Sequence, residues 1–418
     1  MTNREVRVAL ESLGCKLNQA EIEHLSRELA AAGYSVVSPL DRPDVYILNT
    51  CTVTHIADRK ARHLLRMARR HSPGVRLVAV GCYAERMPSD LEPIEGVDLV
   101  IGNDRKSGLV RILSDFLGFP PGAVAAPSAL YEKSRRTRSF IKVQDGCHNF
   151  CAYCIVPLVR SCEYFVPADD VVSQVSDRVA AGFKEVVLTG TEIGTYNYNG
   201  LDLSDLLERI LDETVIVRLR LSSLQPPEIT PELVSLWRDP RLCPHFHLSL
   251  QSGSDSVLHR MKRRYDTAGY RRVVSMIREA VPGVAVTTDV IVGFPGETDA
   301  EFAETLDFCR EMRFARIHVF PFSPRPGTAA AEMKEVVSAQ VKKQRSNQML
   351  SLAETATLDF RRSFIGRTMD VLWEQKSVGI WSGYTGNYIR VYAKDRRDLV
   401  NTITPVNLVE IYRDGILG

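Results

Sequence analysis

The chain lacks any apolar run long enough to span a membrane, and its first residues, Met1 to Glu5, lack the basic and apolar regions of a signal peptide. We therefore expect a cytoplasmic protein without a membrane anchor. It also lacks an excess of either charge, with 53 Lys and Arg against 51 Asp and Glu, so its net charge does not indicate a partner. Nine cysteines in an intracellular chain indicate metal or redox chemistry in preference to disulfides.

Three of these cysteines, Cys147, Cys151 and Cys154, form a Cys-x3-Cys-x2-Cys run after a strand predicted over residues 140–146. Iron–sulfur clusters usually take four cysteines, so three thiolates on one loop indicate a cubic cluster whose fourth iron stays open to a small molecule. The alternative is a zinc knuckle, but structural zinc sites are normally closed by four ligands at other spacings. His148 could be a fourth ligand, although its place beside Cys147 makes joint chelation awkward. The spacing favours the cluster.

The N-terminal part of the chain alternates predicted strands and helices. Strands are expected over residues 6–10, 45–49 and 77–80. We expect Asn18 to cap the first helix, with Glu21 completing a capping box and Gly33 ending the helix, and we expect a basic helix from about His55 to His71. This alternation predicts an α/β fold with a small, doubly wound parallel sheet.

Cys15, Cys51 and Cys82 each follow one of these three strands. Ligands bind at the carboxyl ends of the strands in parallel α/β sheets, so three thiols far apart in the sequence would meet at one edge. Free cysteine is also a common core residue, but a core role would scatter the three along their strands. We therefore predict a second three-cysteine cluster site, again with an open iron.

From residue 139 onward the alternation resumes, with helices predicted near residues 168–181 and 300–312. Further strands are expected over residues 186–189, 217–221, 247–250, 286–292 and 317–320. Six repeats of strand then helix predict a partial (β/α)6 barrel with its chemistry at the C-terminal face. After about Phe360, short alternating strands predict a small antiparallel β-barrel. We expect four parts, an N-terminal domain, a linker, the partial barrel and the small barrel, over residues 1–115, 116–138, 139–356 and 357–418.

Taken together, the motifs resemble those of the radical S-adenosylmethionine (SAM) methylthiotransferase family over nearly the whole chain. The stretches that carry the resemblance are Gly14–Asn18, Asn49–Val53, Gly81–Tyr83, Gly146–Pro157, Leu221–Ser223, Ser249–Ser254 and Asp289–Thr298. The resemblance implies two [4Fe-4S] clusters. In that family the barrel cluster cleaves SAM to a 5′-deoxyadenosyl radical, which removes a hydrogen from a C–H bond, and the auxiliary cluster supplies methylated sulfur.

Carried onto this chain, the resemblance assigns Cys147, Cys151 and Cys154 to the barrel cluster. It assigns Cys15, Cys51 and Cys82 to the auxiliary cluster. The last part of the chain resembles the TRAM domain, an OB-like RNA-binding module. An electron donor such as flavodoxin or ferredoxin is a further implied partner.

Polar residues after the barrel strands are expected to contact SAM. Gly190 and Glu192 follow the second predicted barrel strand, where related enzymes approach the methionine amino group. The other candidates are Arg220, Ser222, Gln251 and Asp289. Ordinary turn or packing chemistry explains each of these residues equally well.

The basic residues of the helix over residues 59–70 indicate an RNA partner. A solvated helix face is the usual explanation of such a run, but its place near Cys51 favours phosphate contacts. Arg59, Arg62 and Arg66 are the candidates on this helix. Further basic residues, Arg135, Arg136, Arg138 and Lys262 to Arg264, would add to the positive surface. Tyr384, Tyr388 and Tyr392 near the C-terminus could stack on bases or belong to a core.

Members of this family modify isopentenyladenosine or threonylcarbamoyladenosine in tRNA, or an aspartate of a ribosomal protein. Gly14–Gln19, Asn49–Thr54 and Ala57–Lys60 most resemble the threonylcarbamoyl branch, and Lys16 stands where the isopentenyl branch has Gln. The resemblance predicts C2 methylthiolation of N6-threonylcarbamoyladenosine at position 37 in the anticodon loop of tRNA. Lys16 or Arg59 could meet the threonyl carboxylate.

The alternatives are the other two substrates of the family and, from another class, an iron–sulfur RNA-binding protein that does not turn over SAM. The last three cysteines, Cys162, Cys243 and Cys309, fit no motif and are expected to be packing or surface thiols.

Overall fold

The computed structural model describes residues 5–118 and 137–418, and the chain divides into two compact units. Of the described residues, the N-terminal unit takes in 5–118, 145–149 and 154–163, and the C-terminal unit takes in 137–144, 150–153 and 164–418. The start of the chain before Glu5 and most of the predicted linker, with Arg135 and Arg136, lie outside the described residues.

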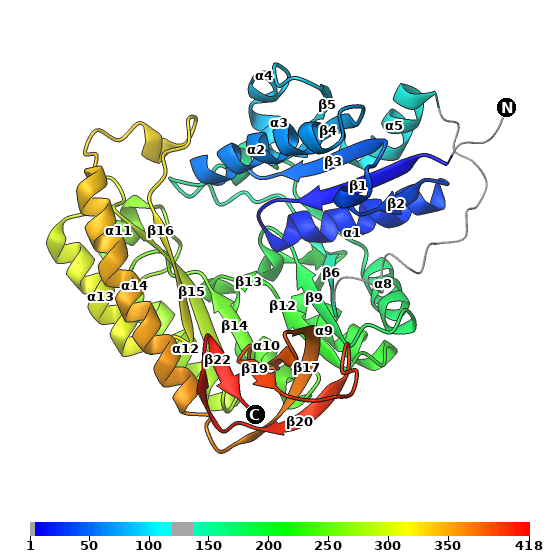
Figure 1. Cartoon of the computed structure of the whole chain (residues 1–418). Helices are drawn as coiled ribbons and strands as arrows, with labels where there is room; N and C mark the ends of the chain where they lie inside the picture. The colour runs from blue at the N-terminus through cyan, green and yellow to red at the C-terminus, as the bar shows by residue number, and fades with distance from the viewer. Residues whose placement is uncertain (1–4, 119–136) are drawn as a thin grey trace. The chain divides into compact units, whose positions relative to one another are not determined.

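The N-terminal unit is built on a five-stranded parallel sheet in the order β2-β1-β3-β4-β5. Its strands are β1 (Arg7–Ser12), β2 (Ser35–Val37), β3 (Val45–Thr50), β4 (Arg76–Gly81) and β5 (Val97–Ile101). Its helices are α1 (Lys16–Ala31), α2 (His55–His71), α3 (Cys82–Arg86), α4 (Pro88–Leu91) and α5 (Leu109–Leu117). Apolar residues of α1 and α5 cover one face of the sheet and those of α2, α3 and α4 the other (Figure 1). The predicted doubly wound parallel sheet is confirmed.

The two long helices of this unit begin in different ways. Thr54 caps α2, its hydroxyl accepting the Ala57 N–H at 3.2 Å, and α2 has the predicted bounds. The predicted capping role of Asn18 is wrong, because α1 begins earlier, at Lys16, and Asn18 lies inside it. The Asn18 amide instead donates to two backbone carbonyls near the ends of β1 and β3, those of Leu13 and Thr50, at 2.8 and 3.0 Å.

The C-terminal unit contains two parallel sheets, in the orders β12-β9-β6 and β13-β14-β15-β16. Their strands are β6 (Arg138–Lys142), β9 (Glu185–Thr189), β12 (Arg218–Leu221), β13 (Ser223–Leu224), β14 (His245–Leu248), β15 (Ala285–Val292) and β16 (Arg316–Pro321). Only Ser222 separates β12 from β13, so these two labels mark one interrupted strand, and the seven labels correspond to six strands. Each of the six strands predicted after residue 139 is found within a few residues of its expected bounds.

Helices alternate with these strands, and all but α11 (Asp255–Arg260) of those named next contribute to one common apolar core (Figure 1). The helices are α8 (Ala168–Ala180), α9 (Leu203–Glu213), α10 (Pro231–Ser235), α11, α12 (Thr267–Ala280), α13 (Asp299–Met312) and the long α14 (Ala339–Arg362). In α11, Val257 packs in a separate cluster with Ala152 and Phe294. A short hairpin joins β10 (Asn197–Tyr198) to β11 (Leu201–Asp202). None of the helices that the structure describes combines the length and apolar character that crossing a membrane requires.

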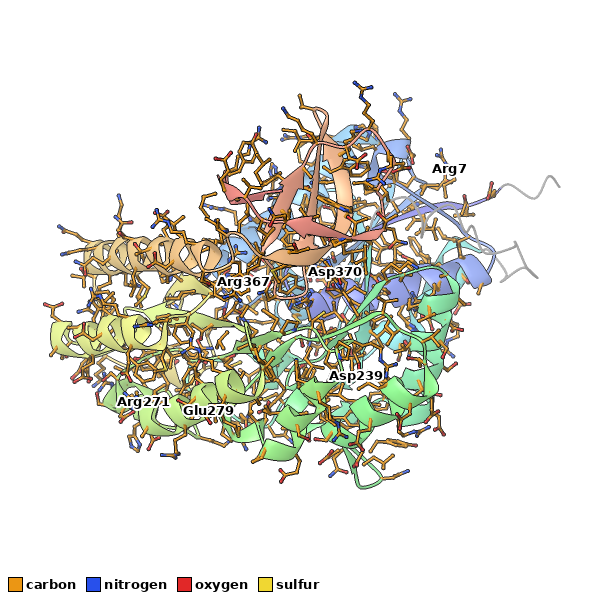
Figure 2. The ribbon with its side chains drawn as sticks, turned by 90° about the horizontal axis from the view of Figure 1, so that it is seen from below. Arg7, Asp239, Arg271, Glu279, Arg367 and Asp370 are labelled. Atoms are coloured by element: carbon orange, nitrogen blue, oxygen red, sulfur yellow. The ribbon has the colours of Figure 1, made fainter. Side chains whose placement is uncertain are left out.

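A six-stranded sheet follows α14, in the order β20-β17-β18-β19-β22-β21. Its strands are β17 (Thr368–Ser377), β18 (Ile380–Thr385), β19 (Arg390–Ala393), β20 (Ile403–Asn407), β21 (Glu410–Tyr412) and β22 (Gly415–Leu417). Arg367 and Asp370, labelled in Figure 2, mark where the sheet begins. The prediction of an antiparallel arrangement is wrong for one pair, since β19 and β22 run parallel.

Candidate functional site

The carboxyl edge of the N-terminal sheet brings Cys15, Cys51 and Cys82 together, because they follow the neighbouring strands β1, β3 and β4. A Cβ added to Gly14 would lie 2.8 Å from the Cys51 Sγ, so only glycine allows this approach. Burial raises the pKa of Cys51 to about 12, and the charges of the other two thiols act in the same direction. The three thiols therefore gather at one edge of the sheet, as the sequence predicted.

The surroundings of these thiols fit a group that takes thiolate ligands. Two side-chain nitrogens donate toward the Cys82 Sγ, Arg160 Nε at 3.3 Å and Asn103 Nδ2 at 3.5 Å. Cys15 is exposed at the surface, but the protein atoms around its thiol raise its pKa, so a bare thiolate there is disfavoured. Three sulfurs at one sheet edge, with N–H donors aimed at one of them, fit an iron–sulfur cluster whose fourth iron has no cysteine ligand.

The second cysteine triplet lies on the loop between β7 (Gln144–Asp145) and α7 (Val156–Val159). The chain enters this loop through Gly146, whose φ is +78°, and a Cβ there would lie 2.3 Å from the Cys162 carbonyl oxygen. His148 Nε2 lies 3.0 Å from the Ser161 carbonyl oxygen, a contact that orients the ring and leaves the alternative of a fourth ligand open. The boundary between the two units crosses this loop, with Cys151 in the C-terminal unit.

Within the C-terminal unit, Cys151 accepts a hydrogen bond from Arg263 Nη1 at 3.1 Å. The Arg263 guanidinium also donates to Gln225 Oε1 at 2.7 Å and lies over the ring of Tyr265. Arg263 is half-buried and its guanidinium is engaged by these partners, so it contributes less to the predicted positive surface than its neighbours do. Arg264 and Lys262, beside it in the sequence, are exposed.

Glu192 lies in a hydrogen-bonded network after β9. Its carboxylate accepts from Arg264 Nη2 at 3.1 Å and from the amide of Gln225, the residue that also contacts Arg263. Burial raises the pKa of the neighbouring Glu228 to about 9, and a protonated Glu228 can donate to Glu192. This network links the Cys151 contact to the end of β9.

Three further SAM candidates also lie where strands end. Gly190 has no room for a side chain, because a Cβ would lie 2.8 Å from the Gln144 carbonyl oxygen. Ser222 is buried between β12 and β13, and its hydroxyl has no hydrogen-bond partner among the described residues. Gln251 has φ of +70° and pairs its backbone with β15.

Asp289, on β15, belongs to a polar cluster that the sequence did not reveal. Its carboxylate lies 3.2 Å from His247 Nε2 on β14, and His318 on β16 completes the group. The other ring nitrogen of His247 lies 2.9 Å from the Thr287 hydroxyl. Neighbouring strands thus present two imidazoles and a carboxylate, which no spacing in the sequence indicated.

Arg220 has a different environment from the other SAM candidates. Its fully buried guanidinium donates to Glu185, the first residue of β9, at 2.8 Å and to the Gly386 carbonyl oxygen at 2.8 Å. It also lies 3.6 Å from the ring centroid of Tyr388. This placement favours a structural role for Arg220, and it favours the core alternative for Tyr388.

The other two tyrosines also have protein partners. Tyr384 lies beneath Arg138, and Tyr392 donates to Asp414. Of the cysteines without a motif, Cys162 is exposed, whereas Cys243 and Cys309 are buried, as expected of surface and packing thiols.

The basic residues of α2 differ in exposure. Arg59 and Arg66 are exposed, whereas Arg62 is half-buried and donates to the Tyr83 hydroxyl. Lys16 is the half-buried first residue of α1 and directly follows Cys15. The first turns of α2, with the exposed Arg59, follow the end of β3 and Cys51, and Arg66 extends the exposed positive face further along the helix.

Comparison with known proteins identifies the family. The model of the Radical SAM superfamily matches residues 141–309, and that of Uncharacterized protein family UPF0004 matches residues 7–102. A threonylcarbamoyladenosine tRNA methylthiotransferase of Thermotoga maritima is 38% identical over 92% of this chain and 90% of its own length. Its Bacillus subtilis counterpart is 35% identical over 98% and 95%. A tRNA-2-methylthio-N(6)-dimethylallyladenosine synthase of Endomicrobium trichonymphae is 32% identical over 98% of both chains.

Among solved structures, a similar fold occurs in the radical S-adenosylmethionine methyltransferase TsrM from Kitasatospora setae. The two match with a TM-score of 0.55 at 17% identity, over 78% of this chain and 77% of TsrM. With relatives above 30% identity along nearly the whole chain, this protein belongs to the radical SAM methylthiotransferase family.

Proposed function

We propose that this protein inserts a methylthio group at C2 of N6-threonylcarbamoyladenosine at position 37 of tRNA. The observation that carries the proposal is the identity to relatives named for this reaction, over nearly their full length, in a chain with both cysteine sets. The converging cysteines at the N-terminal sheet edge support it, as do the exposed arginines of α2.

In this proposal Cys147, Cys151 and Cys154 hold one [4Fe-4S] cluster, and Cys15, Cys51 and Cys82 hold the other. When bound, these clusters would supply one-electron cleavage of SAM and a sulfur for transfer. The protein's own residues orient and shield the reactants.

Among those residues, Arg263 directs an N–H toward the Cys151 sulfur. Glu192, Ser222 and Gln251 place polar groups at strand ends, where SAM would bind, with Gly190 leaving room at the turn. Arg59 and Arg66 would contact tRNA phosphates, while Lys16 would lie near the threonyl carboxylate.

The domain organisation belongs to the same proposal. The strands from β6 to β16 would form one open (β/α)6 barrel, and the sheet from β17 to β22 would be a TRAM-like module that contacts RNA. A flavodoxin or ferredoxin would deliver electrons, and the reaction would take place in the cytoplasm.

The decisive experiment compares tRNA nucleosides by mass spectrometry from cells that lack the methylthio derivative of threonylcarbamoyladenosine. These cells would express the intact chain, a Cys147→Ala variant or a Cys162→Ala variant. We expect the methylthio product with the intact chain and with Cys162→Ala, since Cys162 is exposed and outside both cysteine sets, and no product with Cys147→Ala.

Other outcomes would redirect the assignment. Modification of dimethylallyladenosine instead would keep the enzyme class and change the substrate. Unchanged tRNA, together with formation of 5′-deoxyadenosine by the reduced protein, would favour a ribosomal-protein substrate. Unchanged tRNA without 5′-deoxyadenosine would favour an iron–sulfur RNA-binding protein.

A further inference from the structure

Arg160 is a buried cation that follows the second cysteine triplet by six residues and yet contacts the first cysteine set. Its side chain is only 4% exposed, and its Nε lies 3.3 Å from the Cys82 Sγ. Both residues belong to the N-terminal unit, although 78 positions separate them in the sequence. A buried guanidinium that donates to a cysteine sulfur is a placement that ordinary core packing does not explain.

The remaining donors of Arg160 hold it in one orientation. Its Nη1 donates to Glu21 at 2.9 Å and to both carboxylate oxygens of Asp145 at 2.7 and 2.9 Å. Its Nη2 donates to Asn18 Oδ1 at 3.1 Å and to Glu21 at 3.2 Å. Every nitrogen of the guanidinium therefore has an acceptor, and the planar fork fixes the direction of the Nε–H bond toward Cys82.

These acceptors belong to the surroundings of both cysteine sets. Asn18 lies 3.7 Å from the Cys15 Sγ and donates to the Thr50 carbonyl, next to Cys51. Asp145 stands two residues before Cys147. One guanidinium thus ties the loop of the second triplet to the three-cysteine edge of the sheet.

The local charges show why a cation is tolerated at this depth. Glu21 also accepts from Lys106 Nζ at 2.6 Å, so two buried cations face Glu21 and Asp145. Lys106 donates in turn to Asn103 Oδ1 at 2.7 Å, which orients the Asn103 amide toward Cys82. The charges of the two cations and the two carboxylates cancel. A negatively charged thiolate at Cys82 would therefore accept hydrogen bonds from Arg160 and Asn103, which are already oriented toward its sulfur.

We propose that Arg160 is a positioning residue of the auxiliary site, which holds Cys82 for metal binding and raises the reduction potential of the cluster bound there. This inference rests on the proposed function, since it assumes a cluster on Cys15, Cys51 and Cys82. Hydrogen bonds to cysteine sulfurs stabilise the more negative, reduced state of an iron–sulfur cluster, so their removal lowers its potential. Because Arg160 donates both to Cys82 and to Asp145, just before the second triplet, it also connects the auxiliary site to the loop that carries this triplet.

The test uses the full-length chain with Cys147, Cys151 and Cys154 changed to Ala, so that only the auxiliary cluster can assemble. The protein is reconstituted anaerobically with iron and sulfide, its iron is counted, and the midpoint potential of the cluster is measured by redox titration with electron paramagnetic resonance. This parent is compared with the same chain carrying Arg160→Lys or Arg160→Met.

We expect about four irons in the parent. In Arg160→Lys, which keeps the charge but loses the planar fork, we expect a more negative midpoint potential with the cluster retained. In Arg160→Met we expect a larger negative shift and a loss of iron. The control is Arg345→Met, since Arg345 is equally buried but donates to Glu297 and Asp299, and it should leave the midpoint unchanged.

The outcomes separate this inference from the function on which it rests. Equal midpoints and equal iron in the parent and in both Arg160 variants would overturn the role of Arg160 while leaving the auxiliary cluster in place. A parent that binds no cluster would overturn the auxiliary site itself, and the role of Arg160 with it. Arg160→Met removes one partner of a buried ion pair and could prevent folding. In that case the comparison of the parent with Arg160→Lys still tests the role of Arg160.

Discussion

At the scale of single residues, the carboxyl group of Glu228 gives the fold a dependence on pH. Burial raises the pKa of Glu228 to about 9, above its value in the unfolded chain. Between about pH 5 and pH 9 the folded protein therefore keeps a proton that the unfolded chain has released, and stability falls as the pH rises.

Glu228→Gln should remove this loss, because the amide keeps the shape of a protonated carboxyl and does not titrate. When the pH rises from about 5.5 to about 8, the free energy of unfolding of the wild type should fall by on the order of 1 kcal/mol or more relative to that of the variant. Urea unfolding at the two pH values measures the difference. The exposed Glu232→Gln is the control, and equal pH dependence in the wild type and in Glu228→Gln would refute the prediction.

How far the sequence predicts individual residues depends on how local their contacts are. The meeting of Cys15, Cys51 and Cys82 was predictable, because each follows a strand whose apolar run is visible and parallel strands end at one edge. The inward direction of Arg160 and Arg263 was not, since their sulfur partners lie 78 and 112 positions away. A charged side chain gives no signal of a distant partner.

At the scale of elements, the turn into the second cysteine triplet depends on Gly146. It has φ of +78°, and a Cβ would lie 2.3 Å from the Cys162 carbonyl oxygen, so alanine there is both strained and crowded. We expect Gly146→Ala to destabilise the protein by about 2–4 kcal/mol and to lower the iron bound by this triplet.

Gly182 supplies a matched control for Gly146. Its φ of +92° imposes a similar backbone strain, but a Cβ there would have no heavy atom within 4 Å. Gly182→Ala should therefore cost about 1 kcal/mol and leave the bound iron unchanged. Thermal unfolding and iron analysis of both variants test this, and equal losses would show that crowding at Gly146 is unimportant.

The exposed face of α2 is the second element whose role can be tested. Arg59→Glu or Arg66→Glu should weaken tRNA binding roughly 10-fold at low salt, and each should release about one counterion fewer on binding, because one phosphate is no longer neutralised. Arg111→Glu on α5, which covers the opposite face of the same sheet, is the charge-matched control. Filter binding at several salt concentrations measures this, and an equal effect of all three variants would indicate nonspecific attraction.

At the scale of the molecule, Arg220 joins the last six-stranded sheet to the β9–β12 pair of the C-terminal unit. It donates to the buried Glu185 and to the Gly386 carbonyl oxygen, and Arg218 beside it donates to the carbonyl oxygens of Asp370 and Tyr384. Burial and the three nearby arginines act on Glu185 in opposite directions, and the arginines hold its pKa below the usual value. Its carboxylate therefore depends on Arg220 to remain charged inside the protein.

We expect Arg220→Met to destabilise the C-terminal unit by about 3–5 kcal/mol, because it leaves the Glu185 charge buried without its main partner. Glu185→Gln in the same chain should restore much of this loss, since a neutral amide needs no counter-charge. Arg271→Met, at a residue labelled in Figure 2, removes an exposed ion pair with Glu311 and should cost no more than about 1 kcal/mol. Urea unfolding of the single and double variants gives the coupling energy.

Additive losses of stability, together with a large drop in SAM affinity in the folded double variant, would instead favour the SAM contact that the sequence suggested for Arg220.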